Sequence, residues 1–442
     1  MGLTESQMIE AKDLTKSVIT CDMEGRIETF SRGAETIFGY TPEETIGKQR
    51  VSLFSPGLVV LQYVPGWLKT ASVEGEYRGR TVFVRKDGTQ FAADVRITPT
   101  FKNGVQHGYC GVTTPRPDIP VAEAMPSISA STNVFRWLVV TRAPFLSATI
   151  VPILLGAAWV AATHNPSPFP WLAFALAMVG GIALHVAANT FNDYFDWTSG
   201  TDKANNDYFL PLSGGSRSIE LGLIKLPALF RLAMIALGIA TLCGLALMLM
   251  GRPLLAAFGA AGAFSAYFYT APPLRLAARR GLGELLVGLN FGPLMVAGTT
   301  YALTGQVGPA DFLAGLPVGL LVTAILWINE FPDEDADRAT GKVHLVAVLG
   351  KANARWGYAL IVLGAFALIA YGVAAGVFPL GALIAALAIP IAIYTISVTM
   401  RHYADRQLLP ANQYTIALHL LTGLLMAAGI LWSESIRALL RL

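Results

Sequence analysis

Apolar positions divide the chain into two parts that meet near residue 133. Before that point, apolar residues come in short runs that alternate with polar ones; after it, they form long stretches with few interruptions. Alternation with a period of two is typical of strands with one face in water, whereas about 20 consecutive apolar residues can cross a membrane as a helix. The pattern therefore predicts a soluble α/β domain followed by an all-α polytopic membrane domain.

Residues 1–115 are predicted to form the soluble domain. Apolar and polar side chains alternate from Phe91 to Ile97, between the hairpin-type pairs Asp87-Gly88 and Asn103-Gly104. The other expected elements are a hairpin over 18–22 and 26–30 and short helices over 33–38 and 42–47. Residues 116–132 are rich in Pro, Ala and Ser and have no period, which predicts a linker.

Residues 133–442 contain nine apolar stretches that are long enough, or nearly so, to span a membrane. The fourth is the shortest and is expected to be tilted or partly interfacial. The stretches cover 143–163, 171–191, 226–250, 254–270, 285–303, 312–331, 356–378, 380–400 and 414–431.

Composition agrees with a membrane-embedded chain. Hydrophobic residues make up 54% and charged residues 14%, where an ordinary soluble domain is roughly 25% charged. The net charge of +3 is too small to indicate a nucleic-acid partner. The three cysteines lack metal-ligand spacing, so a reducing compartment is the simplest interpretation.

Basic residues predict the orientation, because Lys and Arg accumulate in cytoplasmic loops. They concentrate before the first stretch and in every second loop, whereas the alternate loops hold only Arg252. The soluble domain and the even loops are therefore expected on the cytoplasmic side of the inner (plasma) membrane, with the C-terminus outside. The residues concerned are Arg136, Arg142, Lys203, Arg217, Lys225, Arg275, Arg279, Arg280, Arg338, Lys342, Lys351, Arg355, Arg401 and Arg406.

Two acidic segments interrupt the apolar pattern, both at predicted cytoplasmic ends of spans. In the first, Asn189, Asp193 and Asp196 are spaced four and three apart; in the second, Asn329, Asp333 and Asp337 are spaced four apart. On a helix these spacings place the side chains on one face. Carboxylates at membrane depth are costly and usually mark function.

Clustered carboxylates without His or Cys favour a hard cation, and Mg²⁺ commonly links such groups to substrate phosphates. The candidate metal ligands are Asp193, Asp196, Asp202, Asp333 and Asp337. All of these except Asp202 are also the candidate catalytic residues. Nearby basic and amide groups are expected to bind a diphosphate. They are Asn189, Asn192, Lys203, Arg217, Arg275, Asn329 and Lys342.

The two acidic segments resemble the paired signatures of the UbiA superfamily of prenyltransferases. The matching residues are Asn192-Asp193-x-x-Asp196 with Asp202, the loop from Ser213 to Arg217, and Asp333-x-x-x-Asp337. The resemblance implies nine transmembrane helices, Mg²⁺, and transfer of a polyprenyl group from its diphosphate to an aromatic acceptor. Several stretches are most similar to the menaquinone branch, which implies 1,4-dihydroxy-2-naphthoate as acceptor; 4-hydroxybenzoate is the alternative.

In the N-terminal part, the order of Asp22, Gly25, Phe38-Gly39-Tyr40 and Asp87-Gly88 resembles a PAS domain. This resemblance implies a sensor that binds an unknown ligand or dimerises. A flavin-adduct cysteine is missing from 46–51.

The sequence departs from the menaquinone branch after Gly341-Lys342. That branch has a basic residue and Thr next and an Arg before Leu-Gly, where this chain has Val343-His344 and Val348. We expect two polar or basic contacts to be lost. Transport of ions through the acidic spans, coupled to the PAS-like sensor, is a non-enzyme alternative.

Overall fold

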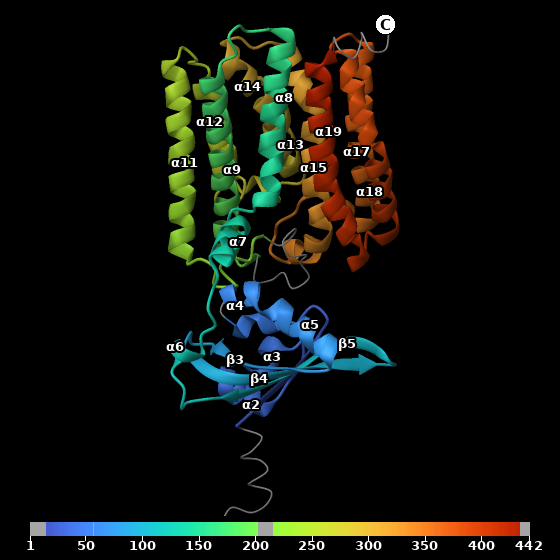
Figure 1. Ribbon diagram of the computed structural model, residues 1–442. Helices are drawn as coiled ribbons and strands as arrows, with labels where there is room; N and C mark the ends of the chain where they lie inside the picture. Colours follow the sequence, from blue (N-terminus) through green and yellow to red (C-terminus); the bar gives the residue numbers. More distant parts are fainter. Residues whose placement is uncertain (1–14, 56, 202–214, 434–442) are drawn as a thin grey trace, which may run out of the picture. The chain divides into compact units, whose positions relative to one another are not determined.

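The computed structural model describes residues 15–55, 57–201 and 215–433 (Figure 1). Its contacts divide the chain into two compact units. Of the described residues, the first unit comprises those up to Leu138 together with Ser218–Lys225, and the second comprises all the others.

The first unit contains a five-stranded antiparallel sheet in the order β2-β1-β5-β4-β3. The predicted hairpins are confirmed: β1 pairs with β2, and the turns at Asp87-Gly88 and Asn103-Gly104 join β3 to β4 and β4 to β5. The strands are β1 (Ser17–Asp22), β2 (Ile27–Phe30), β3 (Tyr77–Val84), β4 (Gln90–Lys102) and β5 (Val105–Pro115).

Short helices lie between β2 and β3. The two predicted ones are present, and Ser31 caps the first by accepting a hydrogen bond from the Ala34 N–H at 3.2 Å. The helices of this unit are α2 (Arg32–Phe38), α3 (Pro42–Thr45), η1 (Val51–Phe54), α4 (Gly57–Gln62), α5 (Val64–Glu74), α6 (Val121–Ala124) and α7 (Ala130–Val140), the last of which ends in the second unit. Aromatic side chains fill the core, with Phe38 touching Phe54, Phe83 and Phe91.

The segment predicted as a linker is attached to this domain. Ala124 packs with Val82 and Ala92 of the sheet. The Ser127 carbonyl accepts a hydrogen bond from the Tyr63 hydroxyl at 2.6 Å. Residues 116–132 show no hydrophobic period because only a few of them pack against the domain.

The second unit is a bundle of apolar helices. Eight helical stretches in the described residues are long and apolar enough to cross a membrane, and the shorter α12 packs against α9 and α11. The shortness of the fourth predicted span is confirmed. The elements are η2 (Ala143–Leu146), α8 (Ser147–Thr163), α9 (Trp171–Ser199), α11 (Leu226–Leu249), α12 (Leu255–Phe268), η3 (Leu276–Ala278), α13 (Leu282–Leu289), η4 (Asn290–Leu294), α14 (Met295–Thr304), α15 (Pro309–Ala339), α16 (Leu345–Leu349), α17 (Lys351–Ala374), η5 (Leu380–Ala388), α18 (Ile389–His402), η6 (Arg406–Leu408) and α19 (Leu409–Leu431).

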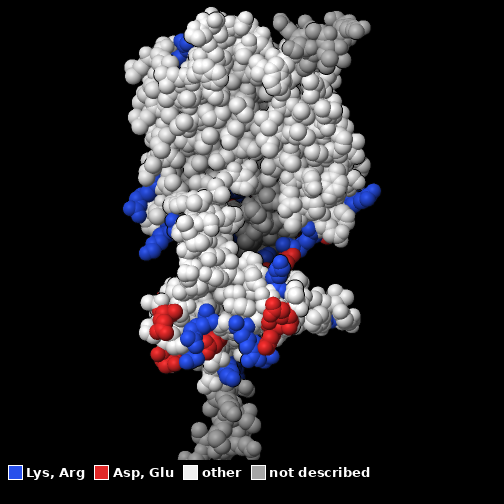
Figure 2. Space-filling view, in the orientation of Figure 1, with Lys and Arg blue, Asp and Glu red and all other residues white. Residues whose placement is uncertain are grey.

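Charge is absent from the middle of the bundle on the face that Figure 2 shows, where Lys and Arg lie mainly near one end of the helices. This distribution fits side chains that avoid hydrocarbon. The chain is therefore a multi-pass membrane protein.

Glycines allow α13 and η4 to pack closely against α15. Gly288 and Gly292 are four apart, as are Gly315 and Gly319. A Cβ on Gly319 would lie 2.5 Å from the Gly288 carbonyl oxygen, and one on Gly292 would lie 2.5 Å from the Gly319 Cα. Small residues at this spacing are typical of close helix crossings in membranes.

We expect Gly319→Ala to destabilise the bundle, because the added methyl group meets backbone atoms that cannot rotate away. Overpacking of this kind costs about 1–3 kcal/mol. Thermal unfolding in detergent measures the effect. Gly244→Ala is the matched control, since nothing lies within 4 Å of a Cβ there. Equal melting temperatures for the two variants would contradict the assignment of a tight crossing.

Candidate active site

The two acidic segments lie on the facing helices α9 and α15. Both helices extend past the predicted apolar stretches, so Asp193, Asp196 and Asp337 are helical. Their exposures are 3%, 8% and 3%. Asp333 lines the same cavity as Asp196 and Asp337. The structure therefore places Asp196, Asp333 and Asp337 at one cavity, and Asp193 is buried one helical turn before Asp196 on α9. Asp333 is half-buried, whereas the other three acids have little access to water.

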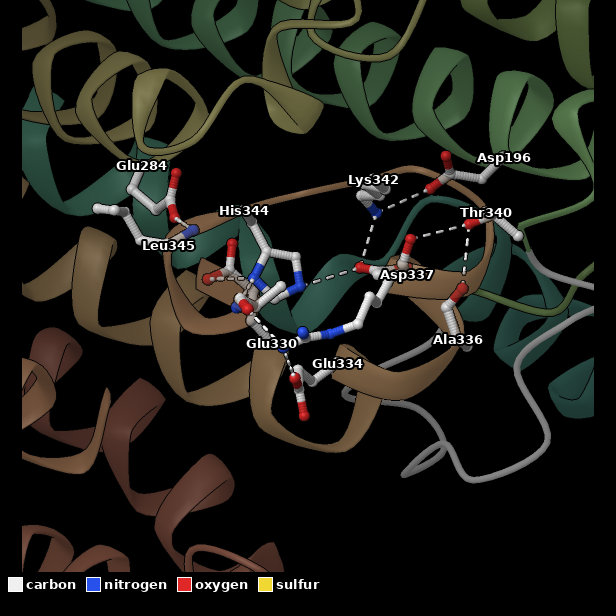
Figure 3. A network of polar contacts seen from close by, with 12 residues as sticks. Asp196, Glu284, Glu330, Glu334, Ala336, Asp337, Thr340, Lys342, His344 and Leu345 are labelled. Carbon is white, nitrogen blue, oxygen red and sulfur yellow. Dashed lines mark hydrogen bonds and ion pairs between the residues drawn. The ribbon is translucent and has the colours of Figure 1, made fainter. Parts of the chain in front are cut away.

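Lys342 connects the two helices. Its Nζ lies 3.4 Å from Oδ2 of Asp196 and 3.5 Å from Oδ2 of Asp337 (Figure 3). Burial on its own lowers the pKa of Lys342, but the neighbouring carboxylates prevail and raise it well above its usual value. The ammonium group therefore stays charged and offsets the repulsion between two carboxylates.

Arg142 provides a second cation beside the first acidic segment. Its Nη1 lies 3.3 Å from Oδ1 of Asn192 and 3.8 Å from Oδ1 of Asp193. The Ser216 N–H donates to the same Asp193 oxygen at 3.3 Å. Sequence reasoning used Arg142 only for orientation. Its site role was missed because the contact joins residues 50 positions apart.

The donor set fits a magnesium ion. Oδ2 of Asp193 is buried and has no hydrogen-bond partner, and the surrounding acids offer oxygen atoms only. An unpaired carboxylate oxygen in a buried site normally requires a cation or a proton. Hard oxygen donors are those that Mg²⁺ prefers.

The remaining predicted residues take different places. The Asn189 amide donates to the Thr141 carbonyl at 3.3 Å, and Asn329 accepts from the Asn412 amide at 2.7 Å. Arg217 is buried with a φ of 52°. Arg275 makes no side-chain contact with the acids among the described hydrogen bonds and ion pairs. Asp202 and Lys203 lie outside the described residues.

A cavity of about 630 Å³ extends from the acids into the bundle. Asn192, Asp337 and Lys342 line one region of it, and apolar residues such as Leu247 and Leu294 line another. His185 also lines the cavity, accepting or donating a hydrogen bond with the Thr149 hydroxyl at 2.8 Å and packing on Phe291. The cavity therefore offers a charged region for an anion and an apolar region for a hydrocarbon.

Three further buried polar residues lie beside the acids: Glu284, Glu330 and His344. The polar or basic contacts expected to be lost are those at Val343 and Val348, and His344 between them makes polar contacts of its own. Its Nδ1 accepts from the Ala347 N–H at 3.2 Å and so caps α16, while Nε2 lies 3.4 Å from Oδ2 of Asp337. Sequence reasoning assigned His344 no role, because its contact with Asp337 depends on how the chain folds after α15.

The chain matches the UbiA prenyltransferase family over residues 149–432. It belongs to that family. A match to the PAS domain family covers residues 15–113. Both resemblances seen in the sequence are thus confirmed. The chain is a prenyltransferase, and the sequence-based alternative of a transporter is not needed.

The similar proteins include two curated prenyltransferases. A "1,4-dihydroxy-2-naphthoate octaprenyltransferase" of Escherichia coli is 30% identical over 306 residues, which cover 67% of this chain and 96% of that protein. A "2-carboxy-1,4-naphthoquinone phytyltransferase" of Synechocystis is 27% identical, covering 67% of this chain and 93% of that one. Among solved structures, the apo UbiA homologue of Aeropyrum pernix has a TM-score of 0.50 at 19% identity, covering 63% of this chain and 97% of the other, which shows a shared fold.

We expect Lys342→Gln to lower the melting temperature when EDTA removes divalent ions, because Asp196 and Asp337 then face each other without the ammonium group. Removing one partner of a buried ion pair costs about 3 kcal/mol or more. Added Mg²⁺ should restore most of the loss. Lys351→Gln is the control, because Lys351 lies 3.3 Å from the exposed Asp335 and its contact with the buried Glu334 is longer, at 3.9 Å. A Lys342→Gln protein as stable as wild type in EDTA would contradict this account.

Proposed function

We propose that this prenyltransferase transfers a polyprenyl group from polyprenyl diphosphate to 1,4-dihydroxy-2-naphthoate, with Mg²⁺ as cofactor. The observation that carries the chemistry is the buried set of carboxylates on α9 and α15 at one region of a partly apolar cavity. The names of the similar proteins support the acceptor. A 4-hydroxybenzoate acceptor would use the same charged region and is the alternative.

Each group near the acids has a proposed role. Asp193, Asp196, Asp333 and Asp337 would hold the metal, with Asp202 as a further proposed ligand. Bound Mg²⁺ would supply the positive charge that draws the diphosphate away from the prenyl carbon.

Basic and amide side chains would hold the diphosphate itself. Lys342 and Arg142 already contact the acids, so they would bind the outer phosphate oxygens as the anion enters. We propose the same role for the other diphosphate-binding candidates: Asn189, Asn192, Lys203, Arg217, Arg275 and Asn329.

The apolar part of the cavity has a chemical task. Breaking the bond between the prenyl carbon and the diphosphate oxygen leaves an allylic cation, which water would quench. Walls such as Ile153, Leu247 and Leu294 exclude water and hold the chain. The electron-rich ring then forms a carbon–carbon bond with the cation. For a naphthoate acceptor, loss of its carboxyl group in the same reaction is part of the proposal.

An assay of purified protein with a long-chain prenyl diphosphate and Mg²⁺ tests the function and its acceptor. We expect product with dihydroxynaphthoate and none with 4-hydroxybenzoate, and loss of product with EDTA. Asp193→Asn and Asp333→Asn should each lower turnover by at least about 100-fold, the scale on which losing an electrostatic stabiliser acts. Asp335→Asn is the control, since the Asp335 side chain is 87% exposed.

Product only with 4-hydroxybenzoate would keep the transferase and overturn the naphthoate acceptor. Wild-type turnover in either aspartate variant would overturn the proposed metal ligands.

We further propose that the PAS domain and the active-site acids lie on the cytoplasmic side of the inner membrane. Lys and Arg of alternate loops support this orientation. With α12 as a ninth crossing, the C-terminus lies outside. Alkaline phosphatase fused after residue 442 should therefore be active, and the same reporter fused after Gly350 should be inactive. An inactive C-terminal fusion would indicate eight crossings or the opposite orientation.

A further inference from the structure

Glu284, Glu330 and His344 form a second polar cluster, beside the acids assigned to magnesium. Glu284 comes from the first turn of α13, Glu330 from α15, and His344 is the residue that caps α16. One ligand-type atom of each lies within 4.8 Å of those of the other two. The three residues are 2%, 8% and 1% exposed. Figure 3 shows the His344 ring between Glu330 and Asp337.

The cluster holds two buried carboxyl groups without a matching cation. Oε2 of Glu284 and Oε2 of Glu330 are buried and have no hydrogen-bond partner. Among the described residues, no Lys or Arg forms an ion pair with either glutamate. Lys342 is engaged by Asp196 and Asp337, and Arg338 by Glu334. A buried carboxylate left in this state is costly unless a proton or a metal ion joins it.

The orientation of His344 adds a nitrogen donor to these oxygens. Nδ1 lies 3.5 Å from Oε2 of Glu330 and accepts a long hydrogen bond, 3.2 Å, from the Ala347 N–H. Nδ1 is therefore the unprotonated ring nitrogen, and it lies beside a carboxyl oxygen with which it shares no hydrogen bond. A metal ion between the two atoms would be coordinated by both, at the expense of the capping bond to Ala347.

We propose that Glu284, Glu330 and His344 bind a divalent first-row transition ion, of the Zn²⁺ or Mn²⁺ class, at a site separate from the diphosphate magnesium. One imidazole and two carboxylates suit such ions better than Mg²⁺, which takes oxygen ligands. Because the three atoms are no more than 4.8 Å apart, an ion placed among them can lie within about 2.8 Å of each. Shifts of well under 1 Å would therefore reach the usual Zn–O and Zn–N distances of about 2.0–2.2 Å.

The ion would hold the segment that carries Lys342. Oε1 of Glu284 accepts from the Leu345 N–H at 2.6 Å, and the Val343 carbonyl accepts from the Arg280 N–H at 2.8 Å. A metal bound to His344 would add a third contact that holds residues 343–345 in place. Glu330 also lines the cavity, so a fourth coordination position would open in that direction.

Metal binding by the full-length protein, without a polyhistidine tag and without any substrate, tests the proposal. The protein is stripped with a chelator, incubated with Zn²⁺ in an excess of Mg²⁺, desalted and measured by mass spectrometry of the elements. We expect about one Zn²⁺ per chain to survive, as for a three-ligand protein site. His344→Thr should lose it, because Thr can still cap a helix but offers no imidazole.

Two variants serve as controls that should keep the ion. His419→Gln removes a buried histidine outside the cluster, and Asp193→Asn alters the proposed magnesium site alone. Wild-type protein without retained Zn²⁺, or His344→Thr with as much as wild type, would overturn the proposal. Loss of the ion in Asp193→Asn would also overturn it, because the ion would then belong to the diphosphate site.

A measurement on wild-type protein covers the case in which His344→Thr does not fold. Cu²⁺ binds such donors more strongly than Zn²⁺, and its electron paramagnetic resonance spectrum shows coupling to a coordinated imidazole nitrogen. Coupling to nitrogen is expected in the stripped wild-type protein and in His419→Gln, and its absence overturns the proposal. Because none of these readouts uses turnover, failure of the metal site is distinguishable from failure of the proposed reaction.

Discussion

The repulsion between carboxylates buried on α9 and α15 is the constraint on which the active site depends. Oδ2 of Asp196 and Oδ2 of Asp337 lie within 3.5 Å of one ammonium nitrogen, so they are at most about 7 Å apart. At an effective dielectric constant of about 20, their repulsion is about 2 kcal/mol or more, and each attraction to Lys342 is about 5 kcal/mol. The attraction to Lys342 therefore outweighs the repulsion between Asp196 and Asp337. Lys342 does not pair with Asp193, so the unpaired oxygen of Asp193 is left for another cation.

The site requires helices to pack closely enough that acidic side chains from different helices come within a few ångströms of one another. The glycine crossing of α13 and η4 with α15 provides one such approach, and it places Glu284 near Glu330. On the other side of the site, the Asn412 amide donates to both the Ile328 carbonyl and Asn329 and so fixes α15 against α19. The site is thus held by packing on one side and hydrogen bonds on the other.

Much of this could be predicted from the sequence, because local patterns carry it. The alternation of apolar and polar residues over Phe91–Ile97 predicts a strand, and the four-residue spacing of Asp333 and Asp337 predicts one helical face. The structure has both. What could not be predicted depends on contacts between distant segments. Arg142 meets Asp193 across 51 positions, and Glu284 meets Leu345 across 61. No periodicity encodes such pairings, since the bundle alone decides which helix ends meet.

The substitution at His344 shows how a local role and a chemical role can be separated. The resemblance to the menaquinone branch implies Thr at this position, and either residue can cap α16 with a side-chain acceptor. The cap explains why the backbone tolerates the change, but it does not explain an imidazole that lies between Glu330 and Asp337. A threonine would not span the gap between those two carboxylates. Histidine in place of threonine therefore preserves the helix cap after Lys342 and adds an imidazole nitrogen as a possible metal ligand next to the active site.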